Sequence, residues 1–404
     1  MSNSRMYDVC IVGAGMWGAT AARHASKQTG LKVCVVGPEE PTLQEFADSE
    51  VFGAHYDAGR IYTTVQGSDT IGRIRGLVSQ RSIERFAEVE ELSGISFHEE
   101  CGFIFFGEVD AFYDSIPEGL SLETAVSIRG RYPYLDTGMD GPTAIFAKRN
   151  SGYLNARKYV QAQLLVARRQ GCDIINAVVS LVTEDDQSVS GGMQVKTESG
   201  RCIMARKVLL CTGAFTPFKD LLPPGLQLDA TVTSDITIRF ELDDEDIKRL
   251  HDMPCLTSEF SKPSPRECYI LPPIRYPDAK VYIKIGHGQF VDTTLDTHEE
   301  VRRWYIDEAD AKVVDILKDI FHSVVQGVKP LSEIYYTCAD LDTPTRLPYC
   351  DMVSPGLGVL VGGNSLGATM AEEMGRMGAD MITGEANWNR DIPKEVFKAR
   401  YTNK

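Results

Sequence analysis

Three glycines near the amino terminus form the pattern in this chain that is best suited to chemistry. Gly13, Gly15 and Gly18 follow an apolar strand predicted over residues 9–12 and precede a helix predicted over residues 19–27. In such a strand–turn–helix the first glycine makes the tight turn, the second lets the backbone approach a pyrophosphate, and the third lets helix and strand pack closely. The anion lies on free N–H groups at the helix N-terminus. The pattern therefore predicts a bound dinucleotide.

A second apolar strand follows the helix and completes the strand–helix–strand order. Met16 and Trp17 lie inside the glycine turn and are predicted to contact the same cofactor. The acidic residue expected after the second strand, where it holds a ribose hydroxyl, is replaced by Gly37. Glu39 or Glu40 is the candidate to take over this role, and the alternative is that both are solvated turn residues.

Composition excludes several classes of protein. The net charge of −15 argues against nucleic acid or an anionic membrane as a partner, because both need a basic face. No apolar run approaches the length of a membrane span, and the residues before the first strand lack the apolar region of a signal peptide, so the cytoplasm is the expected location. The ten cysteines form no C-x-x-C pair, which indicates a reduced compartment and no metal site.

Helix and strand signals alternate along the chain. Residues 152–181 predict an amphipathic helix and then a strand. Residues 193–204 predict a hairpin, and residues 207–211 predict a separate buried strand. Residues 228–290 alternate like antiparallel strands, and residues 298–325 predict a helical stretch. The carboxyl-terminal part repeats the amino-terminal arrangement, with a strand, a glycine-rich turn and a long helix.

This order of elements predicts an α/β fold with two interleaved domains. One is a Rossmann-like dinucleotide-binding domain, and the other is an antiparallel β-sheet domain that caps it and binds the substrate. The first is predicted to comprise residues 1–90, 150–225 and 335–404, and the second residues 91–149 and 226–334.

A cysteine motif in the last part of the chain adds a second signal. Cys338 is followed five and six residues later by Thr343 and Pro344, and Asp351 stands at the thirteenth place. Together with the glycine turn, this motif resembles the flavoprotein amine oxidases of the monomeric sarcosine oxidase and D-amino acid oxidase superfamily, over the whole chain. The resemblance implies FAD as the cofactor, bound covalently through Cys338. The alternative for this residue is a buried cysteine at the end of a strand.

Three further residues gain predicted catalytic roles from the resemblance. It places Lys284 near the flavin ring, where a fixed cation assists oxygen reduction because superoxide and peroxide are anions. An outward-facing lysine on an alternating strand is the alternative. The family binds a substrate carboxylate through the arginine that corresponds to Arg60 and keeps the histidine that corresponds to His55 near the flavin. This chain has one residue more between the two, and the alternatives are a phosphate or surface contact for Arg60 and a satisfied loop histidine for His55.

The carboxyl-terminal glycine-rich turn falls on the family's flavin-contacting loop. Gly363, Asn364, Leu366, Gly367 and Thr369 are its predicted cofactor contacts, and Leu366 stands where a histidine is usual. Thr369 stands where sarcosine oxidases have a lysine that shares the substrate carboxylate. Half of the carboxylate clamp is therefore neutral, which argues against sarcosine itself as the substrate.

Four residues complete the predicted site. Arg346 supplies the missing positive charge if it points inward, and Tyr269 is a weaker candidate for lining the substrate cavity. Val179 and Gly213 are predicted to contact the cofactor, Gly213 because a glycine directly after a buried strand indicates a close approach of the backbone. Fructosyl amine oxidases have a similar Cys…Thr-Pro-Thr-Arg run, so a bulkier N-substituted amino acid is a further candidate substrate.

The activity implied by the resemblance is oxidation of the C–N bond of a small secondary or N-substituted amine or amino acid to an imine. Oxygen then reoxidises the flavin and yields hydrogen peroxide. Two alternatives stay open: an amine or D-amino acid dehydrogenase that passes electrons to another acceptor, and a non-catalytic FAD-binding protein. The expected partners are the amine and oxygen, and the chain is expected to be a monomer or a small homo-oligomer.

Overall fold

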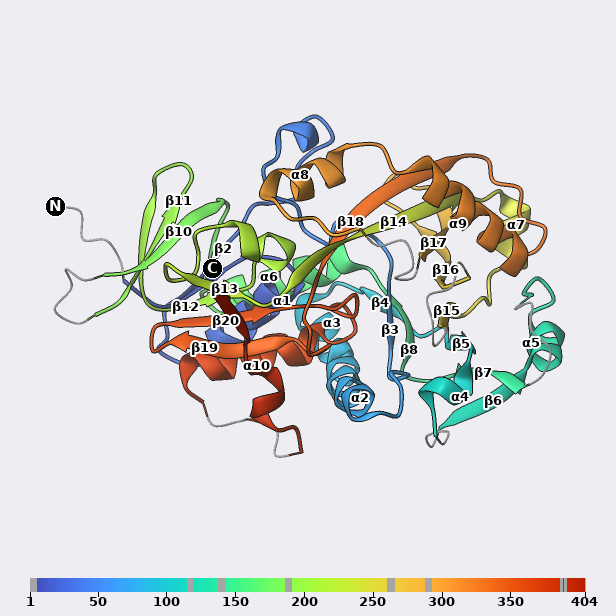
Figure 1. Cartoon of the computed structure of the whole chain (residues 1–404), viewed down its shortest axis with the longest axis horizontal. Helices are drawn as coiled ribbons and strands as arrows, with labels where there is room; N and C mark the ends of the chain where they lie inside the picture. Colours follow the sequence, from blue (N-terminus) through green and yellow to red (C-terminus); the bar gives the residue numbers. More distant parts are fainter. Residues whose placement is uncertain are drawn as a thin grey trace.

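The chain folds around two large sheets, which lie toward opposite ends of its long axis (Figure 1). The computed structural model describes residues 6–114, 119–136, 142–185, 191–259, 266–287, 293–385, 388 and 391–403. Within these residues each sheet has eight strands. The first sheet contains the amino-terminal glycine unit and the second is antiparallel for the most part, so the α/β fold with an interleaved antiparallel sheet is as predicted.

Parallel strands form the centre of the first sheet. β1 (Tyr7–Val12) lies between β2 (Val33–Val36) and β12 (Cys202–Leu210) and runs parallel to both, so the two strands predicted for the glycine unit are confirmed. The last residues of all three strands are buried and apolar, as expected for the central strands of a sheet with helices packed against it. β12 is one continuous strand where the sequence predicted two, since its first residues pair with β11 (Met193–Thr197) and its last with β20 (Leu357–Val361).

Three helices pack together against this sheet. α1 (Met16–Ser26) packs against α6 (Ala156–Arg169) and α10 (Ala371–Thr383). It begins earlier than predicted, directly after Gly15, so that Gly18 lies in its first turn. Gly375 lets α10 approach α1 closely, because a Cβ there would lie 2.4 Å from the side chain of Thr20. The helix predicted within residues 152–181 is confirmed as α6. Where one strand was predicted after it, the structure has two, β9 (Asp173–Ile175) and β10 (Val179–Glu184).

The second sheet confirms the antiparallel strands predicted over residues 228–290. Its strands, in their order across the sheet, are β18 (Glu333–Asp342), β14 (Thr231–Glu241), β17 (Val281–His287), β16 (Cys268–Arg275), β15 (Cys255–Glu259), β5 (Phe103–Gly107), β7 (Pro142–Ala147) and β6 (Leu120–Thr124). Only the β15–β5 pair is parallel in the described part of this sheet. The predicted domain boundary at residue 335 falls inside β18.

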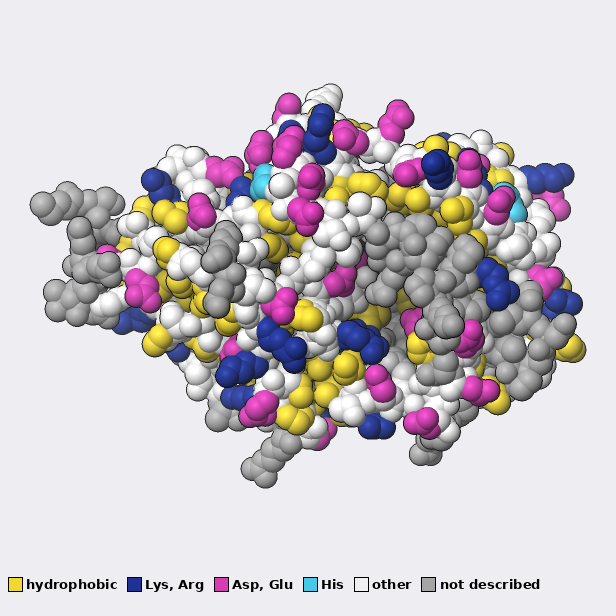
Figure 2. Space-filling model, in the orientation of Figure 1, with side chains coloured by type: hydrophobic (Ala, Val, Ile, Leu, Met, Phe, Trp, Pro, Cys, Tyr) yellow, Lys and Arg dark blue, Asp and Glu magenta, His cyan; other side chains and the backbone are white. Residues whose placement is uncertain are grey.

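The helical stretch predicted over residues 298–325 is two helices, α8 (His298–Ile306) and α9 (Ala311–Val324). Asp310 separates them because its side chain accepts a hydrogen bond from the N–H of Lys312 and so caps α9. Acidic side chains gather over α8 on the face shown in Figure 2. No helix in the described part of the chain is long and apolar enough to cross a membrane.

The remaining elements complete the first sheet, form two smaller sheets or connect these layers. They are the strands β3 (Arg60–Thr63), β4 (His98–Glu99), β8 (Ser151–Leu154), β9 (Asp173–Ile175), β10 (Val179–Glu184), β13 (Leu226–Leu228), β19 (Tyr349–Ser354) and β21 (Tyr401–Asn403), the α-helices α2 (Thr70–Ile83), α3 (Phe86–Ser93), α4 (Val109–Phe112), α5 (Ala125–Arg131) and α7 (Asp244–Arg249), and the 3-10 helices η1 (Phe46–Asp48), η2 (Gly213–Phe218) and η4 (Lys394–Phe397).

Candidate active site

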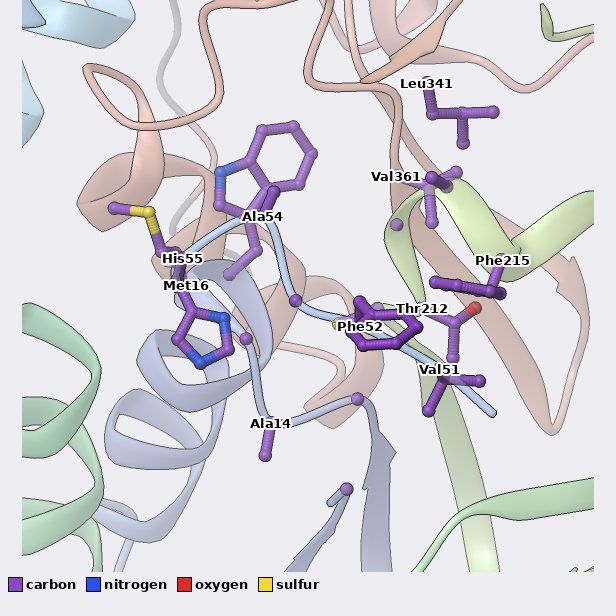
Figure 3. A pocket seen from close by; sticks show the side chains of 18 of the residues that line it. Ala14, Met16, Val51, Phe52, Ala54, His55, Thr212, Phe215, Leu341 and Val361 are labelled. Carbon is purple, nitrogen blue, oxygen red and sulfur yellow. The ribbon is translucent and has the colours of Figure 1, made fainter. Parts of the chain in front are cut away.

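A long cavity lies at the ends of the parallel strands of the first sheet, next to the last residues of β18 in the second sheet. Its volume is about 1420 Å³ with the open mouth included. Figure 3 shows Ala14, Met16 and His55 on one side and Phe52 and Phe215 on the other. The lining is drawn from separate parts of the chain, chiefly residues 12–17, 36–38, 51–56, 177–179, 211–215, 339–341, 360–363, 365 and 367–368.

The glycine turn leaves the N-terminus of α1 open to this cavity. Gly13 has a φ of 104°, and a Cβ there would lie 2.2 Å from the carbonyl oxygen of Cys211, so the turn requires glycine. A Cβ on Gly18 would lie 1.8 Å from the carbonyl oxygen of Gly13. Gly15 is the N-cap, has no side chain to cap the helix, and no acidic residue stands in the first turn. The first-turn N–H groups and the helix dipole therefore fit a pyrophosphate.

Most of the predicted cofactor contacts line this cavity. Trp17 Nε1 donates a hydrogen bond to the carbonyl oxygen of Gly367 at 2.8 Å, which ties the two glycine loops together. Glu39 is exposed beside the lining residue Pro38, whereas Glu40 forms an ion pair with Arg157. The predicted contacts in the lining are Gly13, Gly15, Met16, Trp17, Val179, Gly213, Gly363 and Gly367.

Asn364 and Leu366 belong to the second glycine loop (residues 362–369) but do not line the cavity. Asn364 has a left-handed φ of 47°, its Oδ1 accepts from the N–H of Thr343 at 2.9 Å, and its Nδ2 donates to the carbonyl oxygen of Gly362 at 2.7 Å. The cysteine motif therefore fixes the glycine loop through Thr343. Leu366 packs against the core between the first sheet and its helices.

Cys338 lies on β18, directly before the lining residue Ala339. Its Sγ is 3.7 Å from Arg60 Nη2 and 3.7 Å from Tyr305 Oη. Burial raises the pKa of the thiol to about 12, although the charge of Arg60 opposes this shift. The thiol is thus adjacent to the cavity but behind its surface.

A buried carboxylate that the sequence analysis missed organises the wall next to Cys338. Asp57 forms ion pairs with Arg60, with Lys284 Nζ at 2.7 Å and with Arg239 Nη2 at 3.1 Å. It also accepts a hydrogen bond from Tyr276 Oη at 3.0 Å. We call these five residues the Asp57 cluster. It joins two of the predicted catalytic residues, Arg60 and Lys284, through one carboxylate.

Burial and charge oppose each other in the Asp57 cluster. Burial raises the pKa of Asp57, but the charges of Lys284, Arg239 and Arg60 hold it well below its usual value. Burial lowers the pKa of Lys284 to about 8, against the attraction of Asp57. Lys284 Nζ also donates to the carbonyl oxygen of Gly59 at 2.6 Å, and its side chain is only 1% exposed, so the ammonium is held behind the cavity wall. At neutral pH the cluster carries an excess of positive charge.

His55, for which a place near the flavin was predicted, lines the cavity and carries no charge. Its Nδ1 lies 3.7 Å from the place of a Cβ on Gly15, so the ring stands over the glycine turn. Burial and the neighbouring charges of Arg157 and Arg60 lower the pKa of His55 to about 3. The imidazole is therefore neutral at physiological pH and acts only through its dipole and hydrogen bonds.

Three predicted substrate residues remain: Tyr269 and Thr369 lie inside the protein, and Arg346 lies at the surface. Tyr269 lies beside the Asp57 cluster, with its ring 5.7 Å from Lys284 Nζ. Thr369 forms a closed pair with Thr63, because its Oγ1 accepts from the backbone N–H of Thr63 and donates to its carbonyl oxygen, both at 3.1 Å. Arg346 does not supply the missing charge, since its side chain is 57% exposed and pairs with a surface carboxylate. Among the described residues no group of three or more His, Cys, Asp or Glu is arranged to hold a metal.

A Rossmann-type glycine turn, a second glycine loop and an elongated cavity between two sheets define a dinucleotide-binding flavoprotein. The family model of the FAD dependent oxidoreductases (DAO) matches residues 8–381, and the chain belongs to this family. FAD is thus its cofactor, and the open N-terminus of α1 and the two glycine loops fit that molecule.

Solved structures with the same fold include two oxidases and a dehydrogenase. A Tyr258Phe mutant of NikD, an unusual amino acid oxidase, has a TM-score of 0.75 at 18% identity, with 98% of each chain covered. Glycine oxidase from Geobacillus kaustophilus has a TM-score of 0.70 at 18% identity, with 98% of this chain and 99% of that chain covered. L-proline dehydrogenase from P. horikoshii has a TM-score of 0.67 at 16% identity, with 98% and 97% covered. Among curated proteins none matches the chain in sequence.

Proposed function

We propose that the protein oxidises the C–N bond of a small secondary or N-substituted amine to an imine. The proposal is carried by the cavity, which extends from the FAD site at α1 to Arg60 of the Asp57 cluster. The names of the structurally similar enzymes support it, because NikD and glycine oxidase are described as oxidases of amino acids and the third enzyme as a proline dehydrogenase. All three names refer to chemistry at a carbon–nitrogen bond.

FAD, when bound, would accept the two electrons that leave the C–H bond next to the nitrogen as a hydride equivalent, while the nitrogen lone pair forms the C=N bond. The residues of the chain orient the amine and set the local charge. The Asp57 cluster disfavours an additional positive charge at its end of the cavity, which promotes loss of the proton from the reacting amine. Neutral His55 is available to accept a hydrogen bond from that amine. The imine is then hydrolysed by water.

Lys284 favours oxygen over another electron acceptor. Its ammonium is fixed by Asp57 and Gly59, and a fixed cation stabilises the anion that forms when oxygen receives the first electron. The products of the oxidase are therefore the imine and hydrogen peroxide. A dehydrogenase on the same fold is the second candidate, since one of the similar structures is described as a dehydrogenase.

We also propose Cys338 as the covalent attachment site of FAD. Its Sγ lies next to the cavity lining at Ala339, and the contact with Arg60 Nη2 stabilises the thiolate that attachment requires. Tyr305 contributes a hydroxyl at 3.7 Å on the other side of the sulfur. These contacts distinguish Cys338 from cysteines that are packed among apolar side chains alone.

The experiment that tests the function mixes the FAD-loaded protein with candidate amines in the absence of oxygen. We expect the flavin absorbance to bleach with at least one secondary amine, and to return with peroxide formation when oxygen is admitted. Bleaching without reoxidation by oxygen would select the dehydrogenase. An oxidised spectrum that persists with every amine, in protein that binds FAD fully, would contradict the proposed activity.

A further inference from the structure

The strand pair β14–β18 has one polar face, and its residue Asp340 lines the cavity. The two strands are antiparallel, with Asp235 opposite Cys338 and Thr233 opposite Asp340. Side chains alternate across a sheet, so these residues share the face of Cys338. Ile236 and its apolar neighbours on the other face pack into the core with α9. The polar face thus runs from the Asp57 cluster at Arg239 to three carboxylates, Asp235, Asp340 and Asp342, which we call the carboxylate end.

Asp340 is the member of the carboxylate end that lines the cavity. Its Oδ2 accepts a hydrogen bond from Ser365 Oγ at 2.9 Å, and Ser365 lines the cavity as well. Asp235 accepts from Tyr269 Oη at 3.1 Å, and Asp342 accepts from Thr233 Oγ1 at 2.6 Å. All three partners of the carboxylate end are therefore neutral hydroxyl groups.

The described residues give this end no compensating lysine or arginine within ion-pair distance. His287 Nε2 lies 3.7 Å from Asp235 and accepts a hydrogen bond from the backbone N–H of Ile236 at 3.0 Å. Burial and the repulsion of Asp235 and Asp342 raise the pKa of Asp340 to about 7, against the hydrogen bond from Ser365 and the charge of Arg60. The ionised carboxylate of Asp340 therefore has no cation beside it among the described residues, and a bound cation would stabilise it.

In the described part of the cavity, the two residues predicted to bind a substrate carboxylate, Arg60 and Thr369, already have partners. Arg60 already donates to Asp57, to the carbonyl oxygen of Ala54 at 2.8 Å and toward Cys338. Thr369 is only 2% exposed and closed on Thr63. A carboxylate near Asp340 would also meet a like charge. The wall therefore discriminates between ligands by the sign of their second charged group.

We propose that the substrate is a diamine or polyamine, whose second ammonium group binds Asp340 at the carboxylate end while its reacting amine lies toward the Asp57 cluster. This inference rests on the proposed function, because it names the substrate class for the same cavity. The cavity supplies the binding site, and the carboxylate end decides which charge the site accepts. Asp235 lies behind Asp340 and adds to the negative potential.

The first test compares two ligands that differ only in one end group. Oxidised FAD-loaded protein is titrated with 1,4-diaminobutane and with 4-aminobutanoate, and dissociation constants are read from the flavin difference spectrum. A charge-assisted hydrogen bond to a carboxylate corresponds to roughly tenfold or more in affinity, so the diamine is expected to bind at least that much more tightly. Equal affinities, or tighter binding of 4-aminobutanoate, would overturn the inference even without any variant.

The second test uses Asp340→Asn, with Glu333→Gln as the matched control. Glu333 loses the same charge on the same strand but pairs with Lys318 outside the cavity. Asp340→Asn is expected to remove the preference for the diamine, and Glu333→Gln to preserve it. If Asp340→Asn still binds the diamine more tightly than 4-aminobutanoate, the second ammonium group does not bind Asp340 and the inference is overturned. If the preference for the diamine holds but no amine bleaches the flavin, Asp340 binds a cation but the proposed function fails. If only carboxylate-bearing amines bleach the flavin, the proposed function holds and the diamine inference is overturned.

Discussion

Asp57 is the residue on which the charge balance of the site depends. It is fully buried and compensates three buried cations, Arg60, Arg239 and Lys284. Removing one member of a buried ion pair leaves the others without compensation, which costs far more than breaking an exposed pair. The same carboxylate holds Lys284 and Arg60 in fixed positions beside the cavity. Its loss should therefore be seen in stability as well as in catalysis.

We predict that Asp57→Asn lowers the free energy of unfolding at pH 7 by about 3–5 kcal/mol, measured by urea denaturation. The folded pKa of Asp57 lies below its unfolded value of about 3.9, so its stabilisation is complete above that value and is lost as pH falls toward the folded pKa. The difference between wild type and variant should thus be constant from about pH 5 to 7 and shrink below about pH 4. Glu88→Gln, which breaks an exposed pair with Lys27, is the control and should cost less than about 1 kcal/mol. A similar small loss for Asp57→Asn would show that the cluster does not need it.

The sequence could not predict this cluster because its members are distant in the chain. Lys284 and Asp57 are separated by 227 positions, and only the fold brings them together. Two local signals were nevertheless present. Asp57 stands between apolar Tyr56 and Ala58, where an unpaired carboxylate is costly, and Asp340 stands two places after Cys338, which puts both on one face of a strand.

At the level of elements, α1 and its glycine turn were predictable because their chemistry is local. A turn that needs a positive φ and a helix that packs closely both require glycine at fixed spacing. The direction of Arg346 was not predictable, since it depends on how the loop before β19 crosses the surface. The break between α8 and α9 was missed although Asp310, a typical N-cap, marks it in the sequence.

Gly18→Ala tests how closely α1 must lie on the turn. The added Cβ would be 1.8 Å from the carbonyl oxygen of Gly13, so the helix must move and its open N-terminus moves with it. We expect a loss of about 1–3 kcal/mol in unfolding free energy and a lower FAD content in the purified protein. Gly130→Ala in α5, where a Cβ meets nothing within 4 Å, is the control and should be neutral or slightly stabilising. Full FAD content in Gly18→Ala would mean that the turn tolerates a wider spacing.

At the scale of the whole molecule, the cavity is the place where the two sheets meet. Its lining combines the ends of β1, β2, β12 and β20 with Ala339, Asp340 and Leu341 of β18. Tyr305 of α8 also lines it, and acidic side chains gather over that helix in Figure 2. With a net charge of −15, the molecule attracts cations over a longer range, which agrees with a diamine as the substrate.

A ligand that contacts both sheets should stabilise both, because it binds only where they are assembled. The test needs protein from which FAD can be removed, and Cys338→Ser provides it if Cys338 is the attachment site. We expect acid precipitation to leave the flavin in the pellet for wild type and in the supernatant for Cys338→Ser. Yellow colour retained in the variant's pellet would assign the attachment to another residue.

FAD-free Cys338→Ser protein can then be melted with and without added FAD, with far-ultraviolet circular dichroism reporting the whole fold. Of the three tryptophans, Trp17 of α1 contacts the second glycine loop and reports the first sheet, and Trp304 Nε1 donates to the carbonyl oxygen of Cys338 and reports the second; variants that keep only one of them separate the two signals. At a concentration 100 times the dissociation constant, FAD should add about 2.7 kcal/mol to the unfolding free energy, with a single transition for all signals. Stabilisation of the Trp17 signal alone would mean that FAD binds the first sheet without engaging β18. In that case Cys338 could not lie at the cofactor, and the path from the glycine turn to the Asp57 cluster would not be one site.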